Sequence, residues 1–330
     1  MSADSHTSPS GPPYGCRMVS VGAYLPERVM PVAEAAARYD VDPAWVAKRT
    51  HVVERRFAAE EETLSGIATK ASQIAIERAG ISPDEIDLIL CGTSTAEFQV
   101  PGSAPIIQHA LGATGAGALD VGAACSGWLG SIALGTAMVE SGRAETVLVV
   151  GAEIVSRILG SDPGVGLLMG DGAGAVILRR SAVEDTGIGP AVVHAEGQYA
   201  DFVKIDPGNL EDGRRVLRMV GQETYTVAVK TLVEITREVL EMDDIGLDDI
   251  DLFVYHQANG RILRAVADRL QLPAEKTVSV VERTGNTSAA SIPIALDAAY
   301  AEGRLVPGQK LLLAAIGAGF VSAAAIVTWG

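Results

Sequence analysis

The chain has 330 residues, of which 48% are hydrophobic and 20% charged, as is typical of a well-packed globular protein. Its formal net charge of −15 argues against nucleic acid or an anionic membrane as a partner, because both would repel it. An acidic partner would need a local basic patch. The three cysteines, Cys16, Cys91 and Cys125, form no CxxC pair and no disulfide framework. This pattern favours a reducing cytoplasm and indicates no structural metal site.

The first fifteen residues lack the charged start and apolar run of a signal peptide, and they are rich in Ser, Pro and Gly. We expect residues 1–15 to form a flexible arm. Apolar runs then alternate with helical segments. Strands are predicted around 86–94, 118–123 and 145–153, with helices near 103–111 and 126–141 between them. Continuous hydrophobicity in these strands indicates a sheet covered on both faces, as in α/β proteins.

The pattern occurs twice. Segment 81–91 (ISPDEIDLILC) resembles 245–255 (IGLDDIDLFVY), and segment 132–140 (IALGTAMVE) resembles 294–302 (IALDAAYAE). Compositional similarity could explain either pair alone, but the two displacements along the chain are nearly equal and keep the same order, which favours duplication. We expect an N-terminal half, 16–185, and a C-terminal half, 186–330, packed around a pseudo-twofold axis with a site where they meet.

The segment 311–330 is uncharged and long enough to span a bilayer. The glycine-rich IGAGF at its centre instead favours two buried strands joined by a tight turn, and no membrane contact is expected.

Cys125 is the candidate nucleophile, although an arbitrary cysteine is more often buried and inert. It follows a predicted strand and opens a helix, where free backbone N–H groups would favour the thiolate that captures an acyl group. Small neighbours would leave the sulfur facing a narrow tunnel. Cys91, within an apolar strand, fits the inert role better.

His256 and Asn286 are the candidate partners of Cys125. His256 follows the apolar run DLFVY, at the strand end where α/β sites form. Asn286 lies at a glycine turn opening a helix, where an N-cap role is the ordinary alternative. The displacement that carries position 132 to 294 carries Cys125 to position 287, so we expect Asn286 near the nucleophile.

These three residues suit thioester chemistry. With the acyl group on Cys125, N–H donors of His256 and Asn286 would stabilise the enolate of a malonyl-type thioester as it loses CO2. The enolate would attack the acyl carbonyl, whose oxyanion needs its own donors. Backbone N–H groups of Cys125 and of the turn at 317–320 would supply them.

The motifs AACSG, GDGAGA, HQANxR, GNTSAAS and GAGF occur in the order seen in β-ketoacyl-ACP synthase III enzymes, which the chain resembles from about residue 17 onward. The resemblance implies a five-layered αβαβα thiolase-type fold, a homodimer and no cofactor, with acyl-CoA or acyl-carrier protein (acyl-ACP) as substrates. It also implies Cys125, His256 and Asn286 as the catalytic residues and the backbone N–H of Ala318 as an oxyanion donor.

The resemblance further implies residues that bind substrate or carrier. Trp45 and Arg49 match a coenzyme A-contacting segment, and Arg261 matches an arginine at the tunnel mouth that receives acyl carrier protein. Arg264, three residues later on the same helix face, would extend a basic patch with Arg261. Val100 stands where a larger residue often crosses the dimer to close the acyl pocket, which predicts a longer or branched acyl group. Two positions differ from many members: Pro163 replaces an adenine-stacking arginine, and Thr226 replaces a carrier-contacting lysine.

Three functions follow as hypotheses. The first is decarboxylating Claisen condensation that starts a fatty acid or polyketide chain. The second is transfer of the acyl group from Cys125 to an alcohol or amine, which retention of Asn286 disfavours. The third is a catalytically silent subunit of a synthase heterodimer, which the presence of Cys125 disfavours.

Overall fold

Two large sheets organise the protein, and the computed structural model describes residues 12–206 and 215–330. The first sheet has the order β1-β7-β6-β4-β5 and the second β11-β12-β13-β8. The first sheet consists of β1 (Gly15–Tyr24), β4 (Leu88–Gly92), β5 (Gly117–Val121), β6 (Thr146–Glu153) and β7 (Gly172–Ser181). The second consists of β8 (Ile188–Ala195), β11 (Leu252–Tyr255), β12 (Lys310–Gly317) and β13 (Val321–Thr328). Two small ribbons pair β2 (Val29–Pro31) with β3 (Glu54–Arg56) and β9 (Val203–Asp206) with β10 (Val216–Met219).

The helices cover both sheets and fill the space between them. They are α1 (Val32–Arg38), α2 (Pro43–Thr50), α3 (Leu64–Ala79), α4 (Ser103–Leu111), α5 (Gly127–Glu140), α6 (Pro163–Gly166), α7 (Gly221–Met242), α8 (Gly260–Leu270), α9 (Val281–Thr284) and α10 (Ser291–Ala301). Four short 3-10 turns show the repeat, and η2 and η8 also form part of the site: η1 (Pro83–Glu85), η2 (Ala124–Ser126), η6 (Leu247–Asp249) and η8 (Ser288–Ala290).

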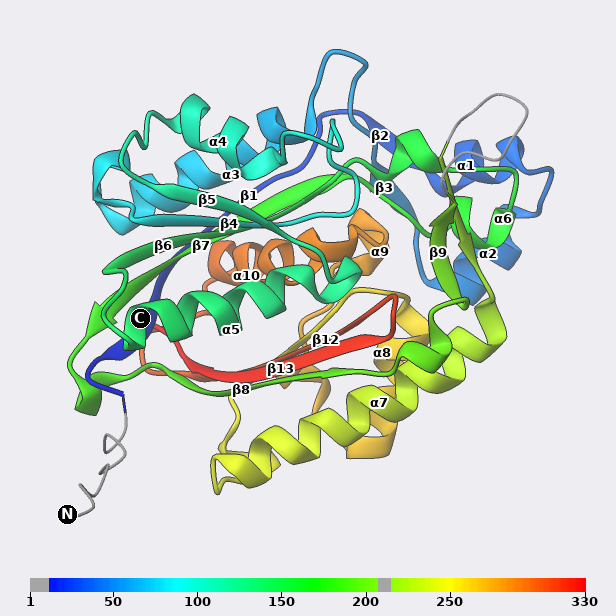
Figure 1. The fold of residues 1–330 in the computed structure, drawn as a ribbon. Helices are drawn as coiled ribbons and strands as arrows, with labels where there is room; N and C mark the ends of the chain where they lie inside the picture. Colours follow the sequence, from blue (N-terminus) through cyan, green and yellow to red (C-terminus); the bar gives the residue numbers. More distant parts are fainter. Residues whose placement is uncertain (1–11, 207–214) are drawn as a thin grey trace, which may run out of the picture.

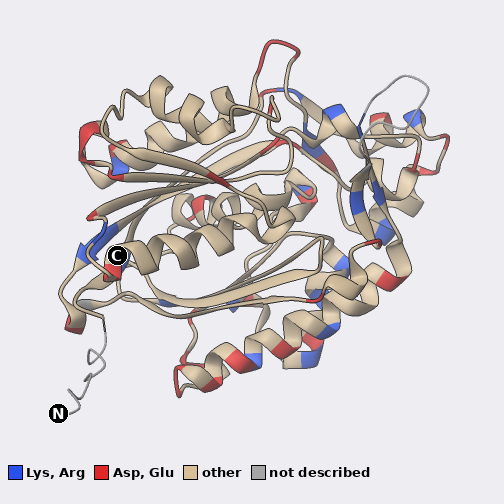
Figure 2. Ribbon diagram, viewed as in Figure 1, with Lys and Arg blue, Asp and Glu red and all other residues tan. Residues whose placement is uncertain are grey.

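Figure 1 shows five layers, in the order helix, sheet, helix, sheet, helix. Helices α3 and α4 lie outside the first sheet, α7 and α8 lie outside the second, and α5 and α10 lie between the sheets. Because α5 is packed on both sides, its sequence is apolar almost all round and carries one charged residue, Glu140. Figure 2 shows the charged segments on the outer elements and loops. The predicted five-layered αβαβα architecture is confirmed.

The strand pattern repeats between the halves. Strands β1, β7, β6 and β4 of the first sheet correspond to β8, β13, β12 and β11 of the second. In both sets the successive pairings are antiparallel, antiparallel and parallel. The 3-10 turns repeat as well, since η6 begins as far along the chain after η1 as η8 begins after η2. The duplication predicted from 81–91 and 245–255 is therefore a duplication of topology, to which the first half adds the edge strand β5.

The repeat corrects one prediction about Asn286. Ala124 and Ser288, which open the equivalent turns η2 and η8, both adopt left-handed backbone conformations, with φ of 46° and 50°. This places Ala289, rather than Asn286, opposite Cys125 in the repeat. The displacement used for the prediction came from the helix segments, and it is slightly shorter than the displacement between the turns.

The C-terminal apolar segment forms two buried strands, as predicted. β12 and β13 pair antiparallel from Lys310↔Thr328 to Gly317↔Val321, with the glycine turn between them. Across residues 12–206 and 215–330, none of the helices has the length and hydropathy needed to cross a membrane. At the other end, β1 already begins at Gly15, whereas residues 1–11 of the predicted arm lie outside the described part of the chain.

Candidate active site

Cys125 lies in the turn η2, between β5 and the start of α5. Ala124 has φ of 46°, an uncommon conformation for a residue with a side chain, and it turns the chain sharply ahead of the cysteine. Ser126 fixes the turn, because its hydroxyl lies 2.7 Å from the Ala123 carbonyl oxygen and 2.9 Å from that of Val321. The first half's turn is thereby tied to β13 of the second half.

Two strand glycines allow the turns of opposite halves to approach. A Cβ on Gly317 of β12 would lie 2.5 Å from the Ala123 carbonyl oxygen, and one on Gly151 of β6 would lie 2.4 Å from that of Ala289. Each sheet therefore packs against the turn of the other half. The candidate active site lies where these two turns meet the opposite sheets, which is where the duplicated halves were expected to meet.

His256 follows β11 and is almost completely buried. Its backbone N–H donates to the Ala314 carbonyl at 2.8 Å, and its Nδ1 lies 2.6 Å from Ser291 Oγ. Ser291 Oγ also accepts from the Gln257 N–H at 3.3 Å, which leaves its own proton for His256 Nδ1. Accepting at Nδ1 assigns the ring proton to Nε2. Burial lowers the pKa of His256 to about 3, so the ring is neutral and Nε2–H is a donor at physiological pH.

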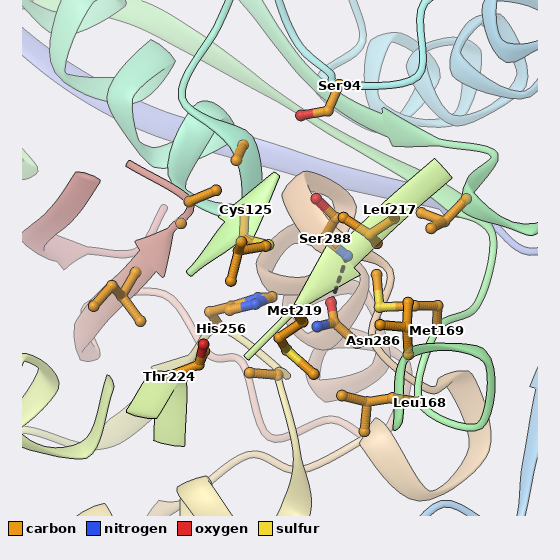
Figure 3. Close-up of a pocket in the computed structure, with 18 of the residues that line it drawn as sticks. Ser94, Cys125, Leu168, Met169, Leu217, Met219, Thr224, His256, Asn286 and Ser288 are labelled. Carbon is orange, nitrogen blue, oxygen red and sulfur yellow. Dashed lines mark hydrogen bonds between the residues drawn. The ribbon is translucent and has the colours of Figure 1, made fainter. Parts of the chain in front are cut away.

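Asn286 lies in the site, and it is not the N-cap of the turn that follows, because that position is Thr287. Its Oδ1 accepts from the N–H of Ser288, the first residue of η8, at 2.8 Å. Its backbone is held by hydrogen bonds with Leu168 and Gly170. With Oδ1 committed, the Nδ2 donors are directed into the pocket, as Figure 3 shows.

Cys125, His256 and Asn286 line one cavity of about 250 Å³. The GAGF turn contributes Gly317, Ala318 and Phe320 to the same cavity. Most of the other lining residues are apolar; among them are Val155, Ile158, Val165, Leu168, Met169, Ile205, Leu217, Met219, Ile262 and Ile316. An apolar cavity with a few convergent polar groups is the usual form of a small-molecule site.

The resting state of Cys125 differs from the expectation. The helix start was predicted to favour the thiolate, but burial raises the pKa of the Cys125 thiol to about 11. A contact with Ser288 lowers this pKa, and the nearby Glu153 carboxylate raises it. Desolvation therefore outweighs the helix start, and the sulfur is protonated at neutral pH.

The predicted substrate-binding residues lie outside this cavity. Trp45 and Arg49 are on α2, with the Arg49 guanidinium 4.7 Å from the centre of the exposed Trp45 ring. Arg261 and Arg264 are exposed on α8, and the Arg261 guanidinium lies 5.3 Å from the ring of Tyr225, a cavity residue. Helices α2 and α8 are in contact, so these residues lie on adjoining elements.

Val100 does not reach the cavity of its own chain. The residue is 84% exposed, in the segment between β4 and α4. The role of Val100 across a dimer stays a prediction.

Sequence reasoning missed three polar residues around the site: Glu153, Ser288 and Ser291. Ser291 orients His256, while Ser288 lies between Asn286 and Glu153. Two signals could have found them. Glu153 is the one charged residue of the strand TVLVVGAE, and Ser288 and Ser291 are the two serines of the GNTSAAS motif. In the described part of the chain, no cluster of three or more His, Cys, Asp or Glu side chains is suited to a metal ion.

A thiol at a helix start, facing two N–H donors at the junction of two duplicated halves, defines a thiolase-type acyl-transfer enzyme. Comparison with known proteins identifies the family within this class of enzymes. Residues 119–197 match the family described as 3-oxoacyl-[acyl-carrier-protein (ACP)] synthase III, and residues 240–329 match its C-terminal domain. The chain belongs to the β-ketoacyl-ACP synthase III family.

Relatives match along nearly the whole chain. The β-ketoacyl-[acyl-carrier-protein] synthase III of Xanthomonas campestris is 42% identical over 95% of this chain and 96% of its own. The crystal structure of 3-oxoacyl-[acyl-carrier-protein] synthase III from Aquifex aeolicus is 37% identical with a TM-score of 0.90, covering 96% of this chain and all of that one. The priming β-ketosynthase of the R1128 polyketide pathway is 34% identical with a TM-score of 0.92, covering 98% of both chains.

Proposed function

We propose that the protein catalyses decarboxylating condensation of an acyl group on Cys125 with a malonyl-type thioester, giving the β-ketoacyl starter of a fatty acid or polyketide. The main support is the pair of oriented donors in one cavity with the thiol. His256 Nε2–H and Asn286 Nδ2–H face the space where an enolate oxygen would gain negative charge. Donors fixed before the charge develops lower the barrier without reorganising.

The roles follow from this geometry. Cys125 accepts the acyl group, and its own backbone N–H with that of Ala318 stabilises the oxyanion of acyl transfer. His256 and Asn286 stabilise the enolate that forms on loss of CO2. The apolar wall of the cavity receives the acyl chain and the arm that carries it.

The acyl group comes from an acyl-CoA or an acyl-ACP. Because the chain is strongly acidic, we propose that Arg261 and Arg264 on α8 form the docking patch for an acidic carrier, with Trp45 and Arg49 on α2 beside it.

We also propose a homodimer. Within residues 12–206 and 215–330, β5 pairs only with β4, so its other edge is open, and Leu119 on that strand is 61% exposed. The neighbouring Phe98 and Val100 are exposed too. An open edge flanked by apolar side chains is a natural pairing surface.

The three free cysteines are consistent with a cytoplasmic location. We also propose that the N-terminal half spans residues 16–185 and the C-terminal half residues 186–330.

The test is a two-step assay on the purified protein. With acyl-CoA or acyl-carrier donors, intact mass should show one acyl group on Cys125; adding malonyl carrier protein should then release CO2. His256→Ala and Asn286→Ala should keep acylation and lose most of the CO2 release, by about 10²-fold or more. Acylation followed by transfer to an alcohol or amine, without CO2, would favour the acyltransferase instead.

A further inference from the structure

Arg55 is a buried arginine of β3 that has no role in the steps above. Its exposure is 0%, and its Nη2 donates to the Leu167 carbonyl oxygen at 2.5 Å. Its Nε and Nη1 are buried without a hydrogen-bond partner among residues 12–206 and 215–330. Burial lowers the pKa of Arg55 to about 10, so the side chain still carries its charge at neutral pH. A buried charge so poorly paired opposes folding, and folding alone does not account for it.

The carbonyl group that Arg55 binds begins a short segment, residues 167–171, which connects α6 to β7. This segment belongs to none of the helices and strands named above, so its position depends on its hydrogen bonds. Arg55 binds its first residue. The neighbouring Arg56 binds its last, because the Arg56 carbonyl oxygen accepts from the Asp171 N–H at 2.9 Å. Two consecutive residues of β3 therefore hold both ends of the segment.

Asn286 is attached to the middle of this segment. Its N–H donates to the Leu168 carbonyl oxygen at 2.8 Å, and its own carbonyl oxygen accepts from the Gly170 N–H at 3.0 Å. These bonds form an isolated parallel bridge between Asn286 and Met169. Figure 3 shows Leu168, Met169 and Asn286 on the same side of the pocket. The backbone of Asn286 is therefore fixed by a segment that β3 holds in place.

The stem of Arg55 also packs behind Asn286. A Cβ on Gly285, the residue before Asn286, would lie 3.3 Å from the Arg55 Cβ, and a Cβ on Gly170 would lie 3.2 Å from the same atom. Gly285 has φ of 62°, a conformation that glycine adopts at little cost. The glycine turn that leads into Asn286 and the segment that binds its backbone thus contact one side chain.

We propose that Arg55 is a positioning residue for Asn286, because it holds the segment and the glycine turn that together direct the Asn286 amide at the enolate oxygen. Arg55 is not among the residues that line the cavity, so it acts through Asn286 and not on the substrate. The proposal rests on the proposed function through the role given to Asn286. Without Arg55, the Nδ2 donors would move away from the enolate oxygen, while Cys125 would stay in place on the turn of the other half.

The first variant is Arg55→Met, which removes the charge and the hydrogen bond but keeps an unbranched stem. Because the buried charge is poorly paired, the thermal unfolding temperature should stay the same or rise. The kcat for CO2 release from the malonyl substrate should fall about tenfold, with acylation of Cys125 unchanged. CO2 release equal to that of the wild type would overturn the proposal. Parallel loss of acylation and CO2 release would overturn it too, because a purely structural role predicts that result.

Arg55→Lys keeps the charge and one donor for the Leu167 carbonyl oxygen. It should recover part of the CO2 release lost in Arg55→Met, and a lysine variant no more active than the methionine variant would contradict the proposal. If Arg55→Met does not fold, Arg55→Lys should still show reduced CO2 release with normal acylation. Arg304→Met is the matched control, because Arg304 donates to the carbonyl oxygens of Glu275 and Thr277. It should release CO2 at the wild-type rate.

The position of Asn286 separates this proposal from the proposed function. If the wild-type protein is acylated but releases no CO2, the proposed function fails. Crystal structures of the wild type and of Arg55→Met then still test the role of Arg55. The variant should show a displaced Asn286, with its hydrogen bonds to Leu168 and Gly170 lengthened or lost. An Asn286 that occupies the same position in both structures would overturn the proposal.

Discussion

Single hydrogen bonds decide which nitrogen atoms face the cavity. Ser291 fixes the tautomer of His256, and the N–H of Ser288 fixes the amide of Asn286. Neither fixing group is a donor to substrate. The orientation of the site is therefore set one residue away from the chemistry, by the turn η8 and the first residue of α10.

Removing the Ser291 hydroxyl should expose this dependence. In Ser291→Ala, His256 Nδ1 loses its donor, and the proton is no longer confined to Nε2. We expect CO2 release from the malonyl substrate to fall about tenfold while acylation of Cys125 is unchanged. Ser131→Ala, which removes a buried hydroxyl bonded to the Gly127 carbonyl inside α5, is the control. Parallel loss of acylation and CO2 release would show a general structural defect instead.

Burial of neutral His256 should make the protein sensitive to acid. Its pKa falls from 6.5 to about 3 on folding, so the unfolded chain binds the extra proton between these values. Above pH 6.5 the titration of His256 costs the folded protein almost no unfolding free energy, and the cost grows as the pH falls toward 3. At pH 5 the loss is about 2 kcal/mol of unfolding free energy. His256→Gln should remove it, which denaturant unfolding at pH 7 and pH 5 would measure; an equal pH dependence in both proteins would refute the assignment.

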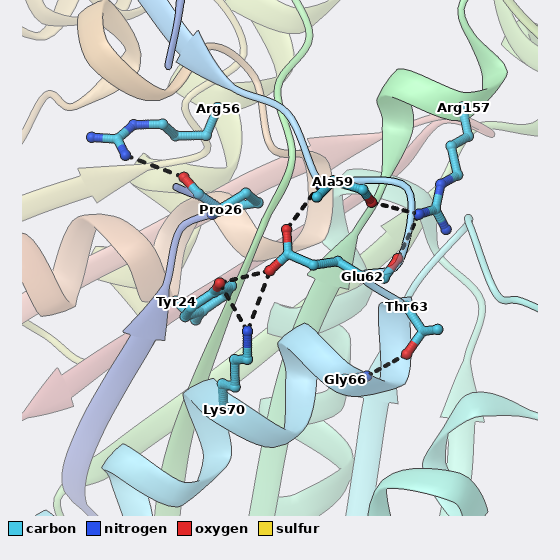
Figure 4. A network of polar contacts seen from close by, with 9 residues as sticks. All are labelled: Tyr24, Pro26, Arg56, Ala59, Glu62, Thr63, Gly66, Lys70 and Arg157. Carbon is cyan, nitrogen blue, oxygen red and sulfur yellow. Dashed lines mark hydrogen bonds and ion pairs between the residues drawn. The ribbon is translucent and has the colours of Figure 1, made fainter. Parts of the chain in front are cut away.

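At the scale of elements, a polar network joins the loop after β3 to β1 and α3 (Figure 4). Glu62 accepts from the Tyr24 hydroxyl at 2.6 Å, the Ala59 N–H at 3.0 Å and Lys70 Nζ at 3.3 Å. Arg157, in the segment after β6, donates to the Ala59 and Glu62 carbonyls of the same loop. The loop is thus held to three elements by side chains rather than by a sheet.

Glu62→Gln should weaken this attachment in a pH-dependent way. Burial alone would raise the pKa of Glu62, but the bonds from Tyr24, Ala59 and Lys70 lower it overall. A carboxyl whose pKa falls on folding stabilises above its unfolded value, and this stability is lost as the pH drops through the folded value. We expect about 1 kcal/mol of destabilisation at pH 7, discounted for partial exposure, and a smaller difference near pH 4. Thermal unfolding measures it, with the exposed Glu61→Gln as control; an effect that is the same at both pH values would count against the carboxylate.

The elements also show what the sequence could predict. α4 was expected at 103–111 and lies at Ser103–Leu111, because a glycine-bounded apolar period is a local signal. The paired strands β12 and β13 were expected for the same reason. Glu153 was not foreseen as part of the site, because its four donors come from residues 93–95 and from Ser288, distant in the chain. The thiolate expectation for Cys125 failed because burial depends on the whole pocket, which local sequence does not encode.

At the scale of the whole molecule, β5 is an edge strand of the first sheet and pairs only with β4 among the described residues. If two chains join there, a charge at Leu119 should separate them, because burying an unpaired lysine is costly. Leu119→Lys should convert a dimer to a monomer of about half the mass by light scattering. Met242→Lys, at the exposed end of α7, should leave the mass unchanged. A monomeric wild type would refute the proposal.

The left-handed residues at Ala124 and Ser288 also bear on ancestry. Both turns keep a strained conformation in a non-glycine residue, at the same step of the same topology, and each packs on a strand glycine from the opposite half. Two copies of a half-length ancestor, pairing with each other, would build such a centre without any second domain. Fusion of two such copies would free each turn to differ from the other. One turn could then carry the sulfur, while the other supplied hydroxyl and amide groups beside it.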